Sequence, residues 1–143
     1  EPACGRYDQR MRILILPALT LVLAAGACNA EDDMTGLPET GSAWTLARLD
    51  GADFGARATL TFPEPGQVAG EAPCNSYGGA QLDALPAFRL GPLRATRRAC
   101  PALAEESAFF AALAAMRHAE VQGETLILSS PDGREMAFDR LQP

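Results

Sequence analysis

A short apolar segment near the start of the chain limits how much of the sequence can belong to a folded domain. Arg10 and Arg12 stand just before residues 13–25, thirteen positions that are apolar except for one threonine. Thirteen helical residues span roughly 20 Å, which is less than the roughly 30 Å hydrocarbon core of a bilayer. A positive start, a short apolar stretch and the small residues 25–27 are typical of a secretory signal that is removed. We therefore expect residues 1–27 to be absent from the mature domain.

The alternative for this apolar segment is a buried core helix. The arginines at its start and the absence of an amphipathic stripe argue against that alternative. Residues 1–10 show no periodicity and precede the start pattern Met11-Arg12. We interpret residues 1–10 as an upstream extension that is lost together with the signal.

Cys28 follows directly after the small residues of the predicted cleavage site. This arrangement resembles a bacterial lipobox, in which the cysteine receives a diacylglycerol thioether and becomes the mature N-terminus. The resemblance implies lipidation of Cys28, and Asn29 after it implies sorting to the outer membrane, facing the periplasm. A lipobox usually carries leucine where this chain has Ala25, so cleavage without lipidation, giving a soluble periplasmic protein, stays open.

The rest of the chain divides into a tether and one domain. Residues 28–42 are acidic, rich in small residues and without periodicity, which predicts a flexible tether after the lipidated N-terminus. Residues 43–141 have the length of a single domain. Without residues 1–27 the chain has 9 basic and 16 acidic residues, a net charge of -7. Such an acidic chain is a poor partner for nucleic acid, so the contact with a membrane is expected through the lipid anchor alone.

The cysteine count fits an oxidising compartment. Cys4 is lost with the signal and Cys28 is used by the lipid, so Cys74 and Cys100 remain as an even pair. We predict that they form a disulfide, worth about 3.5 kcal/mol by the chain-entropy estimate; the alternative is two separate buried thiols. With a single histidine and no C-x-x-C pattern in the chain, we expect no metal, no cofactor and no thiol oxidoreductase chemistry.

Residue patterns in the domain predict an α+β fold, a mostly antiparallel curved β-sheet of about 7–8 short strands with one α-helix packed on it. Alternation of apolar and polar residues and turn signals between them place the clearest strands at residues 44–49, 57–62, 67–72, 125–129 and 135–141. Residues 87–93 are predicted as a further strand, and residues 74–79, rich in Asn and Gly, as a loop.

One helix is predicted over residues 101–119. Four apolar side chains recur on one face of it and are expected to pack on the sheet: Phe109, Phe110, Leu113 and Met116. Glu106 projects into the same face, and a partly buried carboxylate needs a partner. We expect Arg97, Arg98 or free backbone N–H groups to supply that partner in a structural role; a contact between Glu106 and a ligand is the alternative.

Together these residues resemble a META domain, the family of HslJ-like, heat-shock-inducible envelope proteins. The resemblance runs through Trp44-x-Leu46, Leu60-x-Phe62, Gly70, Cys74-Asn75-x-Tyr77, Thr96-x-x-Ala99-Cys100, Glu106-x-x-Phe109-x-x-x-Leu113, Leu126-x-Leu128 and Phe138. It departs from the family at Pro73, where glycine is common. The family's fold is an antiparallel β structure around one helix, and its members are linked to heat shock, novobiocin resistance and virulence. The resemblance implies no catalytic mechanism, and structural roles account for Trp44, Asn75 and Glu106.

These observations predict a non-catalytic exported lipoprotein of the cell envelope. It would act in stress tolerance or envelope maintenance through contacts with another envelope component. No enzyme is expected, because His118 is the only histidine and neither Ser76 nor Ser107 lies in a nucleophile motif. The alternative is a periplasmic β-fold protein that binds a small apolar ligand. An apolar cavity between helix and sheet would favour that alternative, and a filled core would favour a protein partner.

Overall fold

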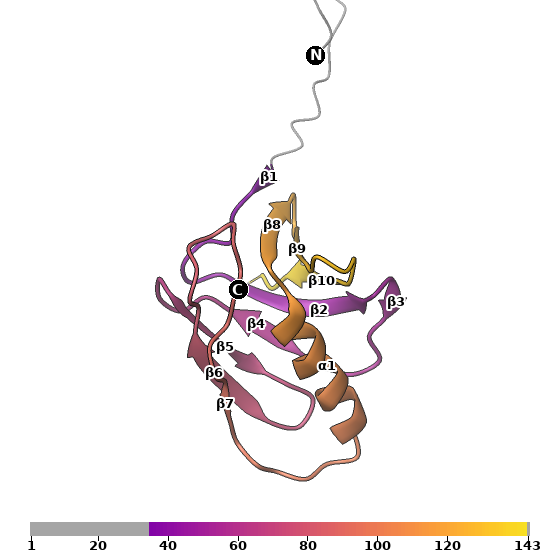
Figure 1. The fold of residues 1–143 in the computed structure, drawn as a ribbon. Helices are drawn as coiled ribbons and strands as arrows, with labels where there is room; N and C mark the ends of the chain where they lie inside the picture. Colours follow the sequence, from indigo (N-terminus) through magenta and orange to yellow (C-terminus); the bar gives the residue numbers. More distant parts are fainter. Residues whose placement is uncertain (1–34, 143) are drawn as a thin grey trace, which may run out of the picture. The chain divides into compact units, whose positions relative to one another are not determined.

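The structure, a computed structural model, describes residues 35–142 and contains one α-helix and ten strands in that range (Figure 1). The elements are β1 (Thr35–Gly36), β2 (Ala43–Leu49), β3 (Ala52–Asp53), β4 (Thr59–Thr61), β5 (Gln67–Glu71), β6 (Ser76–Ala80), β7 (Arg94–Ala95), α1 (Leu103–Ala115), β8 (His118–Gln122), β9 (Thr125–Ser129) and β10 (Glu135–Arg140). Three of these strands have only two residues, which leaves seven longer ones.

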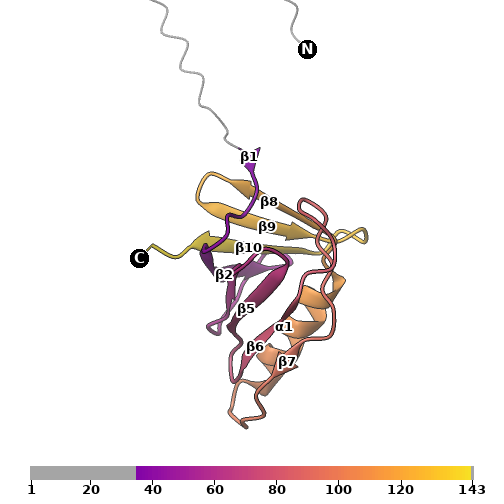
Figure 2. The same ribbon diagram turned by 90° about the vertical axis from the view of Figure 1, so that its left-hand side faces the viewer.

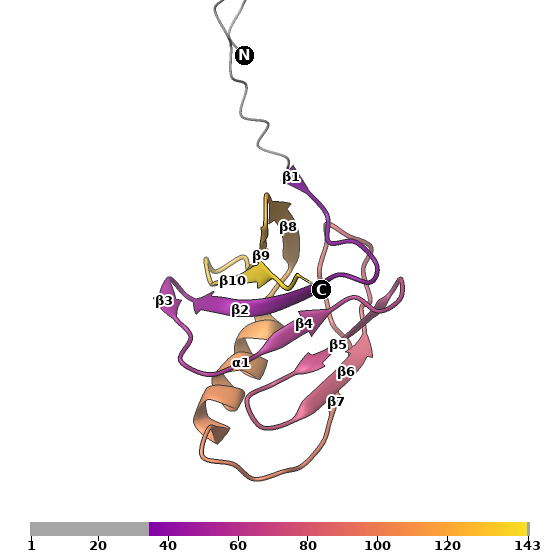
Figure 3. The ribbon, with the colours of Figure 1, turned by 180° about the vertical axis from the view of Figure 1, so that it is seen from behind.

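All strands join one antiparallel sheet in the order β1-β8-β9-β10-β2-β4-β5-β6-β7, and β3 pairs with β2. The sheet bends strongly, so that β8–β10 run across the direction of β5 and β6 in Figure 2. Helix α1 lies in front of the sheet in Figure 1 and behind it in Figure 3, so it covers one face. The predicted α+β fold is confirmed.

The core lies between α1 and the covered face of the sheet. Strict alternation puts Trp44 and Leu46 of β2 inward, and Leu126 and Leu128 of β9 likewise. The largest fully buried side chains are Trp44, Phe88, Phe109, Phe138, Leu60, Leu113, Met116, Leu126, Leu128, Met136 and Val68. Burial of this apolar surface is the main term that stabilises the domain.

Trp44, which the sequence singles out as structural, is completely buried in this core. Its indole Nε1 donates a hydrogen bond to Ser42 Oγ at 2.9 Å, which satisfies the one polar atom of the side chain. The guanidinium carbon of Arg140 stands 4.5 Å from the centre of the indole ring, so a cation–π contact covers its outer side.

Helix α1 is shorter than predicted. It ends at Ala115, because Met116 is extended with ψ 142°, and the next residues form β8 instead of a further helical turn. Ala119 pairs with Leu128 of β9, and its N–H donates to the carbonyl of Pro86 at 2.9 Å. Long-range strand pairing therefore overrides the helical propensity of this alanine-rich stretch.

Two further predictions for the middle of the chain are wrong. Residues 76–79 of the predicted loop belong to strand β6, which runs to Ala80 and pairs with β5 over five residues. Gly79 has a packing reason, since a Cβ there would lie 2.8 Å from Leu93 Cδ2 and 3.2 Å from the Pro92 carbonyl oxygen. Residues 87–93, predicted as a strand, form only isolated bridges at two positions.

The folded part also begins earlier than residue 43. β1 pairs with β8 through Thr35 and Gly36, and Pro38 is buried. Residues 35–42, predicted as part of the tether, thus belong to the domain. Cys28 and residues 1–27 lie outside the described residues.

Candidate functional site

The structure contains the predicted disulfide between Cys74 and Cys100, whose Cα atoms are 5.7 Å apart. Cys74 lies in the connection between β5 and β6, and Cys100 lies three residues before α1 begins. The bond therefore ties the start of the helix to one hairpin of the sheet. The same place brings together Asn75 and Glu106, and we call these four residues the disulfide junction.

Glu106 receives two hydrogen bonds at the junction, although its side chain comes from the buried face of α1. Its Oε2 accepts from the backbone N–H of Cys74 at 2.9 Å, and its Oε1 accepts from Asn75 Nδ2 at 2.7 Å. Of the partners predicted for this carboxylate, the backbone N–H is the one the structure shows, and no ion pair to Arg97 or Arg98 forms in residues 35–142. Both carboxylate oxygens are satisfied, which is the condition for burying such a group.

The amide of Asn75 also forms hydrogen bonds to the segment that follows β7. Its Oδ1 accepts from the N–H of Arg98 at 2.6 Å and from Thr96 Oγ1 at 2.9 Å. Its Nδ2 also donates to the carbonyl of Arg98 at 3.2 Å. One buried asparagine thus connects a hairpin, a helix and a surface segment.

The first prediction concerns the Glu106 carboxylate. Glu106→Gln leaves one oxygen for two donors, so either the Cys74 N–H or the Asn75 amide loses its acceptor. We expect the free energy of unfolding to fall by about 1–3 kcal/mol, the cost of a buried unsatisfied polar group. Urea unfolding measures it, and Glu105→Gln on the exposed side of the same helical turn is the matched control. An equal loss in both variants would contradict the junction's role.

Groups with acid, base or nucleophile chemistry are dispersed in the described part of the chain. His118 is half exposed on β8 and lies 3.8 Å from Glu120. Ser76 Oγ donates to Glu71 Oε2, and Ser107 Oγ donates to the Leu103 carbonyl, so neither serine contacts the histidine. Residues 35–142 contain no group of three metal-ligating side chains. Within that range, no helix has the length and apolar character that crossing a bilayer requires.

One ion pair links the turn after β2 to the residue that precedes β10. The Arg134 guanidinium donates to Asp50 Oδ2 at 2.8 Å, and the N–H of Glu135 donates to Oδ1 at 3.1 Å. The hydrogen bond from Arg134 is the main reason that the pKa of Asp50 lies below its usual value. Because both side chains face solvent, the pair positions a turn and stabilises the fold little.

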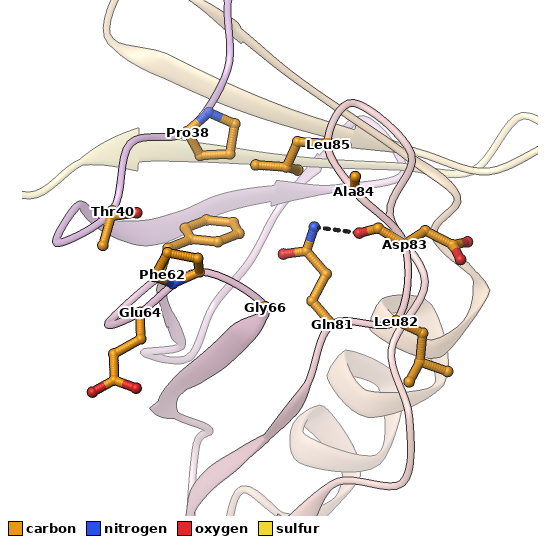
Figure 4. Close-up of a pocket in the computed structure, with 11 residues that line it drawn as sticks. Pro38, Thr40, Phe62, Glu64, Gly66, Gln81, Leu82, Asp83, Ala84 and Leu85 are labelled. Atoms are coloured by element: carbon orange, nitrogen blue, oxygen red, sulfur yellow. Dashed lines mark hydrogen bonds between the residues drawn. The ribbon is translucent and has the colours of Figure 1, made fainter.

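A surface cleft of about 380 Å³ opens beside the N-terminal segment of the domain (Figure 4). Phe62, Pro38 and Leu85 form its apolar walls, and the Gln81 amide is held by a hydrogen bond to the Asp83 carbonyl at 2.9 Å. A larger hollow of about 640 Å³ lies over β5 and β6. Neither includes a residue of α1, whose inward side chains are buried against the sheet.

Comparisons with known proteins agree with this architecture. A search of curated proteins finds no match. The chain is similar to the NMR structure of a protein from Burkholderia xenovorans, at 26% identity and a TM-score of 0.60, over 73% of this chain and 84% of that one. A second NMR structure, at 17% identity and a TM-score of 0.55, shares the fold over 70% of this chain and 89% of its own. The profile of the META domain matches residues 37–143, three quarters of the sequence, and the chain therefore belongs to the META domain family.

Proposed function

We propose that this chain is a non-catalytic lipoprotein of the bacterial cell envelope, anchored to the outer membrane through Cys28 and facing the periplasm. The observation that carries the proposal is the Cys74–Cys100 disulfide at the base of α1. A structural disulfide persists in an oxidising compartment, which a chain with a signal segment before Cys28 would reach. Two separate features of one sequence thus support export.

We also propose that the protein acts in stress tolerance or envelope maintenance by contacting another envelope component. Two features of its side chains support this proposal. The side chains of Asn75 and Glu106 are buried, and their polar atoms form hydrogen bonds within the chain. The face of α1 that could border a ligand cavity is filled, with Phe109 completely buried and Leu113 1% exposed. A filled core of this kind supports a surface contact with another envelope component rather than an enclosed apolar ligand.

The second prediction tests the anchor. In a bacterial host, the protein is expected in the outer-membrane fraction, and Cys28→Ser is expected to move it to the soluble periplasmic fraction, because the thioether needs the sulfur. Fractionation followed by immunoblotting measures this shift, with Cys100→Ser as a control that removes a cysteine but leaves the anchor. If Cys28→Ser left both the mass and the location of the protein unchanged, lipidation would be excluded.

A further inference from the structure

Three exposed arginines fall within residues 94–98, on the segment that contains β7 and follows β6. Arg94, Arg97 and Arg98 are all exposed, and they are a third of the nine arginines in residues 28–143. Arg89, Arg134 and Arg140 each lie within 3.3 Å of a carboxylate. By contrast, Arg94, Arg97 and Arg98 form no ion pair with any residue in 35–142. We propose that this arginine surface binds an acidic segment of another envelope protein.

Hydrogen bonds to β6 and to Asn75 fix the backbone of the segment that carries the three arginines. β7 pairs with β6 through Ala95 and Arg94, and the N–H of Thr96 donates to the Ser76 carbonyl at 3.0 Å. Asn75 then binds both the N–H and the carbonyl of Arg98. Binding an acidic partner therefore needs little ordering of the main chain, which lowers the entropic cost of association.

The hollow of about 640 Å³ over β5 and β6 lies next to this surface, since Arg94 forms part of its wall. Small residues form its floor, Ala69 from β5 and Gly78 from β6. A Cβ added at Gly78 would lie in ordinary van der Waals contact, 3.4 Å from the Val68 carbonyl oxygen and 3.7 Å from Ala69 Cβ, so this wall of the hollow has no bulky side chain. An extended peptide can approach the sheet closely there while its carboxylates reach the guanidinium groups, which favour planar oxyanions.

The position of the arginine surface favours a protein partner over the anchoring membrane, an argument that rests on the proposed lipidation. β7 and the segment leading to α1 lie at the opposite end of the domain from β1 in Figures 1–3. Six residues separate Cys28 from Thr35, and the seven Cα–Cα steps between them span at most about 25 Å. A domain of this size is about 34 Å across, so a tether shorter than the domain favours orientations in which its far end points away from the lipid surface.

Binding of the full-length protein to poly-L-glutamate tests the arginine surface. We expect Arg97→Gln/Arg98→Gln to weaken binding about tenfold, from two lost exposed charge pairs, and the wild-type affinity to fall as salt is added. Arg48→Gln/Arg57→Gln removes the same charge from exposed arginines without ion pairs elsewhere in residues 35–142, and it is expected to change binding less than twofold. Arg97→Lys/Arg98→Lys keeps the charge and is expected to retain most of the affinity.

Three results would overturn this proposal. The first is unchanged binding by Arg97→Gln/Arg98→Gln, which would leave the arginines only the role of keeping edge strand β7 from pairing with other molecules. The second is an equal loss in the Arg48→Gln/Arg57→Gln control. The third is binding of the Cys28→Ser protein to phosphatidylglycerol vesicles that Arg97→Gln/Arg98→Gln weakens more than it weakens binding to poly-L-glutamate, which would assign the surface to a membrane. Because these assays do not depend on Cys28, their failure is distinguishable from a failure of the lipidation proposal.

Discussion

Gly70→Ala is expected to lower the free energy of unfolding by about 4 kcal/mol, through steric strain and a disrupted hydrogen bond. A Cβ at this position would lie 2.1 Å from the carbonyl oxygen of Thr59, an overlap that a backbone atom cannot relieve by changing rotamer. The same methyl group would lie 2.9 Å from the Tyr77 hydroxyl. That hydroxyl donates to the Thr59 carbonyl at 2.7 Å, so a shift of β4 or Tyr77 breaks a buried hydrogen bond.

The buried state of Tyr77 provides an independent readout of this prediction. Tyr77 is 5% exposed, and burial, with the charge of Glu71 as a smaller cause, raises the pKa of its hydroxyl. In Gly70→Ala, we expect urea unfolding at lower denaturant and ionisation of the tyrosine at lower pH than in the wild type. Gly55→Ala is the matched control, because its Cβ would have open space around it. Equal stability of the Gly70→Ala and Gly55→Ala variants would show that β4, β5 and β6 do not pack as described.

Loss of the disulfide is expected to have the next largest effect. The disulfide closes a loop over 26 residues and so limits the conformations of the unfolded chain. Without it, in Cys74→Ala/Cys100→Ala, the unfolded state gains entropy, and the free energy of unfolding should fall by about 3.5 kcal/mol. For a domain of this size the melting temperature should fall by about 20 °C. Thermal unfolding with and without dithiothreitol measures the effect, and dithiothreitol should leave the double variant unchanged. A wild-type protein that melts at the same temperature with and without reductant would contradict a stabilising disulfide.

The sequence predicts those elements whose residue pattern is strong over several positions. Trp44 and Leu46 in β2 and the pair Leu126 and Leu128 in β9 alternate cleanly with polar residues, so their strands follow from period two alone. The disulfide follows from counting cysteines, because the pairing has one solution once Cys4 and Cys28 are set aside. These predictions need only local pattern and chemistry.

Other features depend on residues that are far apart in the chain. Residues 76–79 have the composition of a loop, and only the folded chain shows their ladder with β5 and the close approach of Leu93 to Gly79. Likewise, His118 and Ala119 continue an alanine-rich helical pattern but leave the helix to pair with β9. Local propensity is too weak to oppose such tertiary contacts.

The junction shows the same division between sequence and structure. The helical spacing identifies Glu106 as a carboxylate on an apolar face, so the need for a partner is predictable. Its partners, the Cys74 N–H and Asn75, come from residues more than thirty positions earlier, and only the folded chain brings them together. The arginine surface also requires the structure, since three arginines in sequence do not reveal whether acids from other strands neutralise them.

The most direct test of the central claim is mass spectrometric peptide mapping, without reduction, of the protein isolated from the envelope of its host. An exported and lipidated protein should give an N-terminal peptide that begins at Cys28 with the mass of the attached lipid. The same digest should contain Cys74 and Cys100 in one disulfide-linked pair of peptides. Recovery of a chain that retains residues 1–27 in the cytoplasm, with Cys74 and Cys100 as free thiols, would contradict the account.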